Sequence, residues 1–227
     1  MQVIKLQQAI AGYKAFLKRD RACAELYKWE SLRHFQAQWD VAAADFGQMY
    51  ERCLYNSQWQ NLWKGPGWFP KEMMREIIRV EPDRVRDLFM GLCQEAWDPL
   101  MRISHFKDVC DELLATHRHL PGLWRENDHY HSDNRMIFLY LAFLFPEKYT
   151  LFDYAPFRKT LQLLGTGDLP APYDTDRFIK IAQALYKFLL KDEELLALHR
   201  RRRDPDLHFM GDSMLLVHDF YVEMGSK

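Results

Sequence analysis

Apolar residues recur with the period of an α-helix through almost the whole chain, and this pattern most constrains the fold. In residues 3–19, for example, Leu6, Ile10 and Tyr13 fall on one helical face. A spacing of 3.6 residues indicates amphipathic helices, whereas half-buried strands alternate with a period of two. We find neither alternating strand and helix segments nor a convincing ladder of strands. The sequence therefore predicts an all-α fold.

Breaker residues divide this pattern into about 9–12 helices joined by irregular, aromatic-rich loops. The expected helices cover residues 3–19, 22–39, 40–54, 71–80, 83–92, 95–117, 136–145, 156–164, 175–190 and 192–202, followed by an ambiguous apolar segment at 212–223. Pro70 suits the first turn of a helix, where no backbone N–H is needed, and Glu81-Pro82 separates the helices at 71–80 and 83–92. Residues 165–174 (GTGDLPAPYD) are the strongest linker or loop candidate.

The domain organisation has two alternatives. The 227 residues form a single helical domain, or they form two lobes, 1–118 and 133–224, joined by an irregular loop at 119–132. That loop begins at Leu120-Pro121-Gly122, which ends the preceding helix.

Composition excludes several classes of protein. The chain is 48% hydrophobic and 15% aromatic, enough to close a core, so disorder is excluded for most of its length. Its net charge of −1 gives no general attraction to DNA or to anionic membranes. The longest apolar run, Met136–Phe145, is about half of a membrane span. The four cysteines lack any C-x-x-C pair and no signal peptide precedes them, so we expect reduced thiols in the cytoplasm.

The segment Asp128–Phe157 combines a polar entry with a strongly apolar helix. His129, Asp133 and Arg135 lie in its polar part. We interpret these three residues as a structural motif, with Ser132 or Asp133 capping the helix. Arg135 is expected in a partly buried ion pair, so its substitution should damage folding more than binding.

Two clusters are candidates for nucleic-acid binding. Guanidinium groups of the run Arg200, Arg201, Arg202 and Arg203 could pair with phosphates, although such a run is also typical of a solvent-exposed helix end. Because like charges repel, we expect all four to be exposed. In the tryptophan-rich turn 59–70, Trp63 or Trp68 could stack on a base, or could instead belong to the core.

No pattern in the sequence indicates a catalytic site. His117, His119, His129 and His131 form two H-x-H pairs that could bind zinc, but no cysteine or carboxylate spacing completes a known site. We therefore predict no metal and no cofactor. The chain has no GxxxxGK[ST] phosphate loop and no local spacing that suggests a nucleophile. We predict that it is not an enzyme.

Four segments, in order, carry a resemblance. They are Tyr27–Glu30 with Leu32, His34, Phe35, Trp39 and Asp40; Asp128–Tyr149; Lys191–His199; and Asp206–His208 through to Asp219–Phe220. Together they resemble the N-terminal region of McrB-like AAA+ proteins, the NTPases that work with the McrC nuclease in modification-dependent restriction. The resemblance covers residues 22–221. The run His131–Arg135 departs from the usual Gln-Asp-Asp/Glu-Arg pattern and keeps the arginine.

The resemblance implies a targeting domain in anti-phage defence. In such proteins a motor with Walker motifs follows this region, so an AAA+ motor and an McrC-like nuclease are implied as partners. By analogy the domain would bind DNA, through Arg200–Arg203 and through Trp63 or Trp68. The alternative is a protein-interaction domain that docks a partner subunit or a phage protein without binding nucleic acid.

Overall fold

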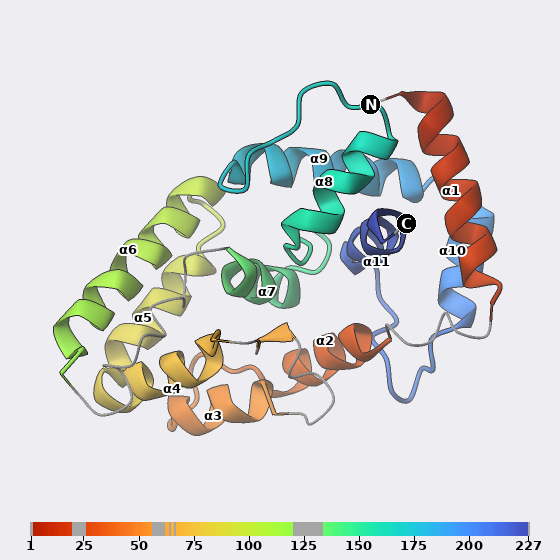
Figure 1. Ribbon diagram of the computed structural model, residues 1–227. Helices are drawn as coiled ribbons and strands as arrows, with labels where there is room; N and C mark the ends of the chain where they lie inside the picture. The colour runs from red at the N-terminus through yellow and green to blue at the C-terminus, as the bar shows by residue number, and fades with distance from the viewer. Residues whose placement is uncertain are drawn as a thin grey trace. The chain divides into compact units, whose positions relative to one another are not determined.

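The computed structural model describes residues 2–19, 26–55, 62–63, 65, 67–119 and 134–226. Within these ranges the chain forms eleven α-helices and no β-strand, and the only strand-like pairing is an isolated bridge between Gly65 and Trp68 (Figure 1). The predicted all-α fold is confirmed. None of the helices in these ranges has both the length and the apolar character needed to cross a bilayer.

The chain divides into two compact units. Unit 1 contains Met1–Leu32 and Phe145–Lys227, and unit 2 contains Arg33–Leu144. Helix α2 (Tyr27–Gln38) contributes to both. These limits differ from the expected lobes, because unit 1 takes residues from both ends of the chain. Residues on both sides of the 119–132 loop belong to unit 2.

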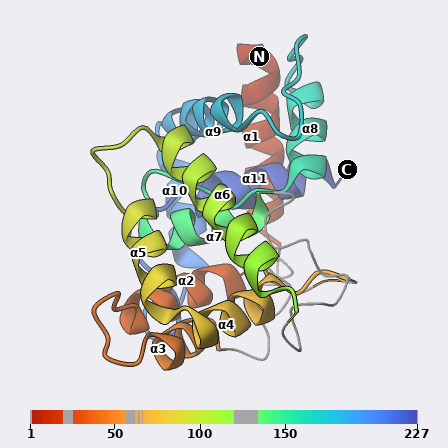
Figure 2. The same cartoon turned by 90° about the vertical axis from the view of Figure 1, so that its left-hand side faces the viewer.

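Unit 1 is built around its last helix. It contains α1 (Val3–Leu17), α8 (Tyr154–Leu163), α9 (Thr175–Leu189), α10 (Glu193–Arg201) and α11 (Leu215–Gly225). Helix α11 packs against α1, α8 and α9, and α10 packs against α1 (Figures 1 and 2). Because α11 is covered from several directions, it is apolar on most of its circumference, which explains its ambiguous periodicity.

A close backbone approach fixes the contact between α11 and α8. A Cβ placed on Gly225 would lie 2.3 Å from the carbonyl oxygen of Pro156. Only glycine leaves room for that separation.

Unit 2 encloses helix α7 (Arg135–Leu144) with α3 (Phe46–Cys53), α4 (Pro70–Val80), α5 (Pro82–Leu92) and α6 (Pro99–His117). Helix α7 is buried from Met136 to Phe143, as its apolar sequence predicts. The Tyr140 ring contacts Tyr50 from α3, Phe89 from α5 and Phe106 from α6. The hydroxyl groups of Tyr140 and Tyr50 share a buried hydrogen bond of 2.7 Å.

Most helix starts lie where the sequence places them. Pro70 occupies the first turn of α4, as predicted, and Pro82, expected in the break between two helices, is the first residue of α5. The expected helix at 40–54 begins later, at Phe46. The Asp40 carboxylate accepts a hydrogen bond from the Ala42 backbone and turns the chain, and Asp45 then caps α3. This side-chain competition for backbone donors outweighs the helix propensity of Ala42–Ala44.

Candidate functional site

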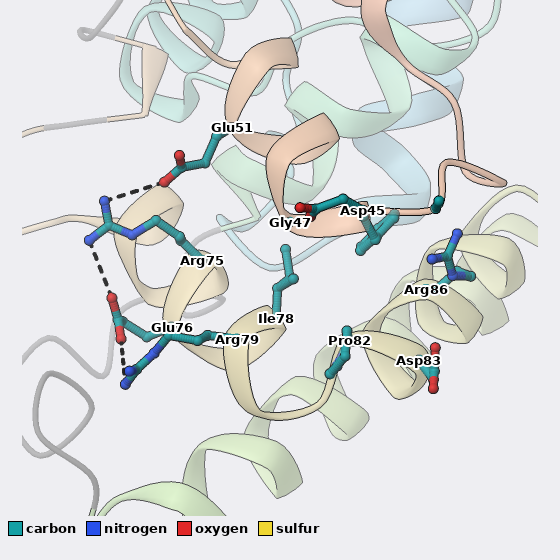
Figure 3. Close-up of a pocket in the computed structure, with 12 residues that line it drawn as sticks. Asp45, Gly47, Glu51, Arg75, Glu76, Ile78, Arg79, Pro82, Asp83 and Arg86 are labelled. Carbon is teal, nitrogen blue, oxygen red and sulfur yellow. Dashed lines mark hydrogen bonds and ion pairs between the residues drawn. The ribbon is translucent and has the colours of Figure 1, made fainter.

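A groove of about 630 Å³ lies between α3, α4 and α5 of unit 2 (Figure 3). It is lined by residues 44–47 and 51, by residues 75, 76, 78 and 79 of α4, and by residues 82, 83 and 86 of α5. Its position follows from two helix starts, because Asp45 caps α3 and Pro82 begins α5 after a sharp turn. We call this the α3–α4–α5 groove.

The floor of the groove is apolar. Phe46, Ile78 and Pro82 line it, and the Ile78 side chain lies against Gly47, where an added Cβ would be 3.4 Å from Ile78 Cγ2. A Cβ at position 47 would therefore be in van der Waals contact with Ile78.

The rim carries charges of both signs. Arg75 bridges two carboxylates, with its nitrogens 3.5 Å from Glu51 and 3.3 Å from Glu76, and Arg79 lies 3.1 Å from Glu76 (Figure 3). On the α5 side, the Arg86 guanidinium lies 5.1 Å from the centre of the Phe46 ring and donates to the Val41 carbonyl. The pairs of Arg75 and Arg79 are solvent-exposed, whereas Arg86 is partly covered.

The predicted arginine cluster divides into two pairs in unit 1. Arg200 and Arg201 are exposed. Arg202 instead turns its guanidinium nitrogens inward, beside the Tyr13 hydroxyl. The Arg203 guanidinium lies 4.3 Å from the Trp29 ring centre and donates to the Phe209 carbonyl at 2.8 Å. Burial, reinforced by neighbouring arginines, lowers the pKa of Arg203 to about 10.

The expected exposure of all four arginines is therefore wrong for Arg202 and Arg203. Where α10 ends, tertiary packing buries the guanidinium nitrogens of Arg202, and an aromatic face and backbone carbonyls offer partners to Arg203. Only Arg200 and Arg201 remain available as phosphate contacts.

The tryptophans proposed to stack on a base are buried. Trp63 is 3% exposed and Trp68 is 5% exposed. The Lys71 ammonium lies 5.6 Å from the Trp63 ring centre, and the Arg135 guanidinium lies 3.8 Å from that of Trp68. Both rings are thus part of the packed structure of unit 2, which favours the core alternative.

The structural motif is described only in part. Arg135 is exposed and stacks on Trp68, so its expected partial burial is wrong. His129 and Asp133 lie outside the described residues, as do Ser132 and His131. Asn134 precedes α7 with a φ of 55°, a left-handed conformation that asparagine tolerates, and its side chain accepts a hydrogen bond from Lys107. Among the described residues, no three His, Cys, Asp or Glu side chains are placed to hold a metal ion.

A buried polar network in unit 1 was not predicted as a site. Asp219 lies 2.7 Å from the Lys28 ammonium and accepts hydrogen bonds from Trp29 Nε1 at 2.8 Å and from His199 Nε2 at 3.3 Å. Lys28 also donates to His218 Nδ1 at 3.1 Å. The only sequence signal for this network is that three of the four resemblance segments contain its members.

The electrostatics of the network follow from burial and from one cation. Burial lowers the pKa values of His199 and His218, so both imidazoles are held neutral. Burial alone would raise the pKa of Asp219, but Lys28 and His199 hold it well below its usual range. Lys28 and Asp219 have side chains 0% and 2% exposed, so this ion pair is closed to ligands and serves the packing of unit 1.

The α3–α4–α5 groove is open, and it combines an apolar floor with charges of both signs. No protein-family model, curated protein or solved structure matches the chain.

Proposed function

We propose that this chain is a non-catalytic recognition domain whose α3–α4–α5 groove binds a polypeptide segment. The observation that carries this proposal is the groove itself, with its floor of Phe46, Ile78 and Pro82 beneath a rim of both charge signs. An apolar side chain flanked by charged residues is complementary to such a surface, since the floor takes the apolar group and the rim fixes its orientation.

The rim favours polypeptide over nucleic acid. It carries three arginines (Arg75, Arg79 and Arg86) against four carboxylates (Asp45, Glu51, Glu76 and Asp83). Two of those arginines are already paired with rim carboxylates. A phosphate backbone would therefore meet net negative charge and few available donors, whereas nucleic-acid surfaces are strongly positive.

The resemblance to McrB-like N-terminal regions supplies the wider setting for this proposal. In that setting the groove would bind a partner subunit or a phage protein. An AAA+ motor with an McrC-like nuclease would then respond to this binding. The convergence of Trp29, His199 and Asp219, from three of the quoted segments, supports a common structural role for those segments.

Selection from a displayed random-peptide library tests the groove. The wild-type chain should enrich peptides with one apolar residue between charged residues. Arg79→Glu reverses a rim charge and should lose those peptides. Arg52→Glu, which changes an exposed arginine outside the groove, should keep them. If Arg79→Glu and Arg52→Glu enrich the same peptides equally well, the groove is not the binding site.

DNA binding is the second candidate, and the exposure of Arg200 and Arg201 in the last turn of α10 favours it. Each phosphate contact contributes about −0.9 to the slope of log K against log salt. Arg200→Ala with Arg201→Ala should therefore reduce the slope for duplex DNA by about 1.8. The control pair Arg158→Ala with Lys159→Ala, exposed on α8, should leave it unchanged. Absence of binding to both modified and unmodified duplexes at low salt would exclude this candidate.

A further inference from the structure

The corner between α5 and α6 carries large apolar side chains in solvent. Met90 is 53% exposed, Trp97 46%, Leu100 37% and Met101 64%. We call these four residues the methionine–tryptophan patch. Scattered exposed apolar residues are ordinary, but several in one place indicate an interaction surface.

His105 connects the patch across the two helices. Its ring centre lies 6.2 Å from that of Trp97, in an edge contact. Its Cδ2 atom would be 3.8 Å from a Cβ on Gly91, the neighbour of Met90. Met101 is one turn before His105 on α6, so Trp97, the end of α5 at Gly91 and the first turns of α6 meet around His105. Methionine adapts its shape to a ligand, and tryptophan supplies a large rigid contact.

The surroundings of the patch are acidic. Asp87 is exposed one turn before Met90, and Glu95 and Asp98 are exposed in the turn that leads into α6. The segment 93–98 contains no lysine or arginine.

The lysine and arginine side chains of α5 and α6 all have partners within the protein. Arg84 lies 2.6 Å from Glu112, Arg86 donates to the Val41 carbonyl, buried Arg102 donates to the Leu92 carbonyl, and Lys107 donates to Asn134. Arg102 is buried, so the exposed charged side chains around the patch are carboxylates.

We propose that the methionine–tryptophan patch binds a basic amphipathic helix of a partner protein. Lysine or arginine residues on the flanks of such a helix complement the carboxylates, and its apolar face covers Met90, Trp97 and Met101. A helix is favoured over an extended peptide, because the described part of unit 2 has no strand edge to which a peptide could add. The patch shares no residue with the α3–α4–α5 groove, so this inference goes beyond the proposed function.

A synthetic helix of leucine and lysine, with leucines at positions i, i+3, i+4 and i+7, is the probe. Its control has glutamate in place of every lysine. Fluorescence anisotropy of the labelled peptides with the full chain should show binding of the lysine peptide at least about tenfold tighter than that of the glutamate peptide, and the difference should shrink with added salt. Equal binding of the two peptides would overturn the proposal.

Two variants locate the binding. Trp97→Ala with Met101→Glu should weaken the lysine peptide about tenfold or more, whereas Tyr55→Glu, an exposed aromatic outside the patch, should not. Asp87→Lys with Glu95→Lys leaves the apolar residues intact and should reverse the preference toward the glutamate peptide. An unchanged preference in this second variant contradicts the inference, even if the first variant fails to fold.

Two further outcomes would also overturn it. A dimer in sedimentation that Met101→Glu dissociates would make the patch a contact between copies of this chain. Binding to phosphatidylserine vesicles that the same substitution abolishes would make it a membrane contact.

Discussion

Asp219 is a buried charged residue at the centre of a polar network in unit 1. It is buried, ionised and held by one cation and two neutral donors. Removing one partner of such a pair leaves an uncompensated charge in the core, which costs far more than the pair itself contributes.

We expect Lys28→Met to lower the free energy of unfolding by about 3–5 kcal/mol. Urea denaturation would measure the change. Lys18→Met, which removes an exposed partner of Glu194 on the same unit, should cost about 0–1 kcal/mol. Equal denaturation midpoints for the two variants would mean that the buried ion pair stabilises the fold no more than the exposed one does.

The two buried histidines should make stability depend on pH. Because the folded-state pKa values of His199 and His218 are lowered, the unfolded chain binds protons first as the pH falls. The free energy of unfolding should thus be constant above the unfolded-state pKa of about 6.5 and decrease below it. The carboxylates with lowered pKa values, such as Asp219, add to this loss only at lower pH. Urea titrations at several pH values should show a flatter slope for His199→Gln with His218→Gln, and an equal slope would contradict the assignment.

The environment of single residues was also hard to predict from the sequence. The arginine run and the tryptophans were recognised as unusual, but sequence spacing does not show which groups a fold covers. Arg203 finds an aromatic face and a carbonyl, and Trp68 is covered by Arg135. These partners are distant in sequence or lie beyond a turn, so their contacts appear only in three dimensions.

At the scale of elements, caps and prolines determine where helices begin. The Asp45 carboxylate accepts a hydrogen bond of 2.8 Å from the Gln48 backbone and so fixes the start of α3 at the edge of the groove. Where aspartate caps were not recognised, as at Asp40–Asp45, the expected boundary was wrong by several residues. Where proline or a strong apolar period marked the boundary, as at Pro70, it was predicted correctly.

Asp45→Ala should lower the free energy of unfolding by about 1 kcal/mol, because a backbone donor of α3 loses its partner. Asp153 is a matched control, since it occupies the N-cap of α8 but its side chain makes no capping hydrogen bond. Thermal unfolding of the two alanine variants would compare them. A larger loss for Asp153→Ala would show that the cap at α3 is not what stabilises this start.

At the scale of the whole molecule, the arrangement of the units was the least predictable feature. A loop such as 119–132 is a reasonable boundary by composition, yet the division depends on which helices pack together. Helix α1 packs against α10 and α11, nearly the full length of the chain away. The α3–α4–α5 groove was missed for the same reason, because its three helices contribute residues without a shared local motif.

We expect Gly225→Leu to destabilise unit 1 selectively by about 1–3 kcal/mol, because its side chain would overlap the Pro156 backbone. Hydrogen exchange followed by mass spectrometry should show faster exchange in α8 and α11 and unchanged exchange in α3–α7. Gly167→Leu, at a position with no atom within 4 Å of the added Cβ, should change neither region. Uniformly faster exchange in both units would contradict the division.

Unit 1 contains residues from both ends of the chain, so its parts leave the ribosome at different times. At about 5–20 residues per second, the ribosome would deliver α11 on the order of ten to forty seconds after α1. Unit 2, which is continuous, can be completed within that interval. The apolar face of α1, with Leu6, Ile10 and Tyr13, stays uncovered until α10 and α11 have been synthesised. In the nascent chain, α1 is therefore the segment where we expect a chaperone to bind.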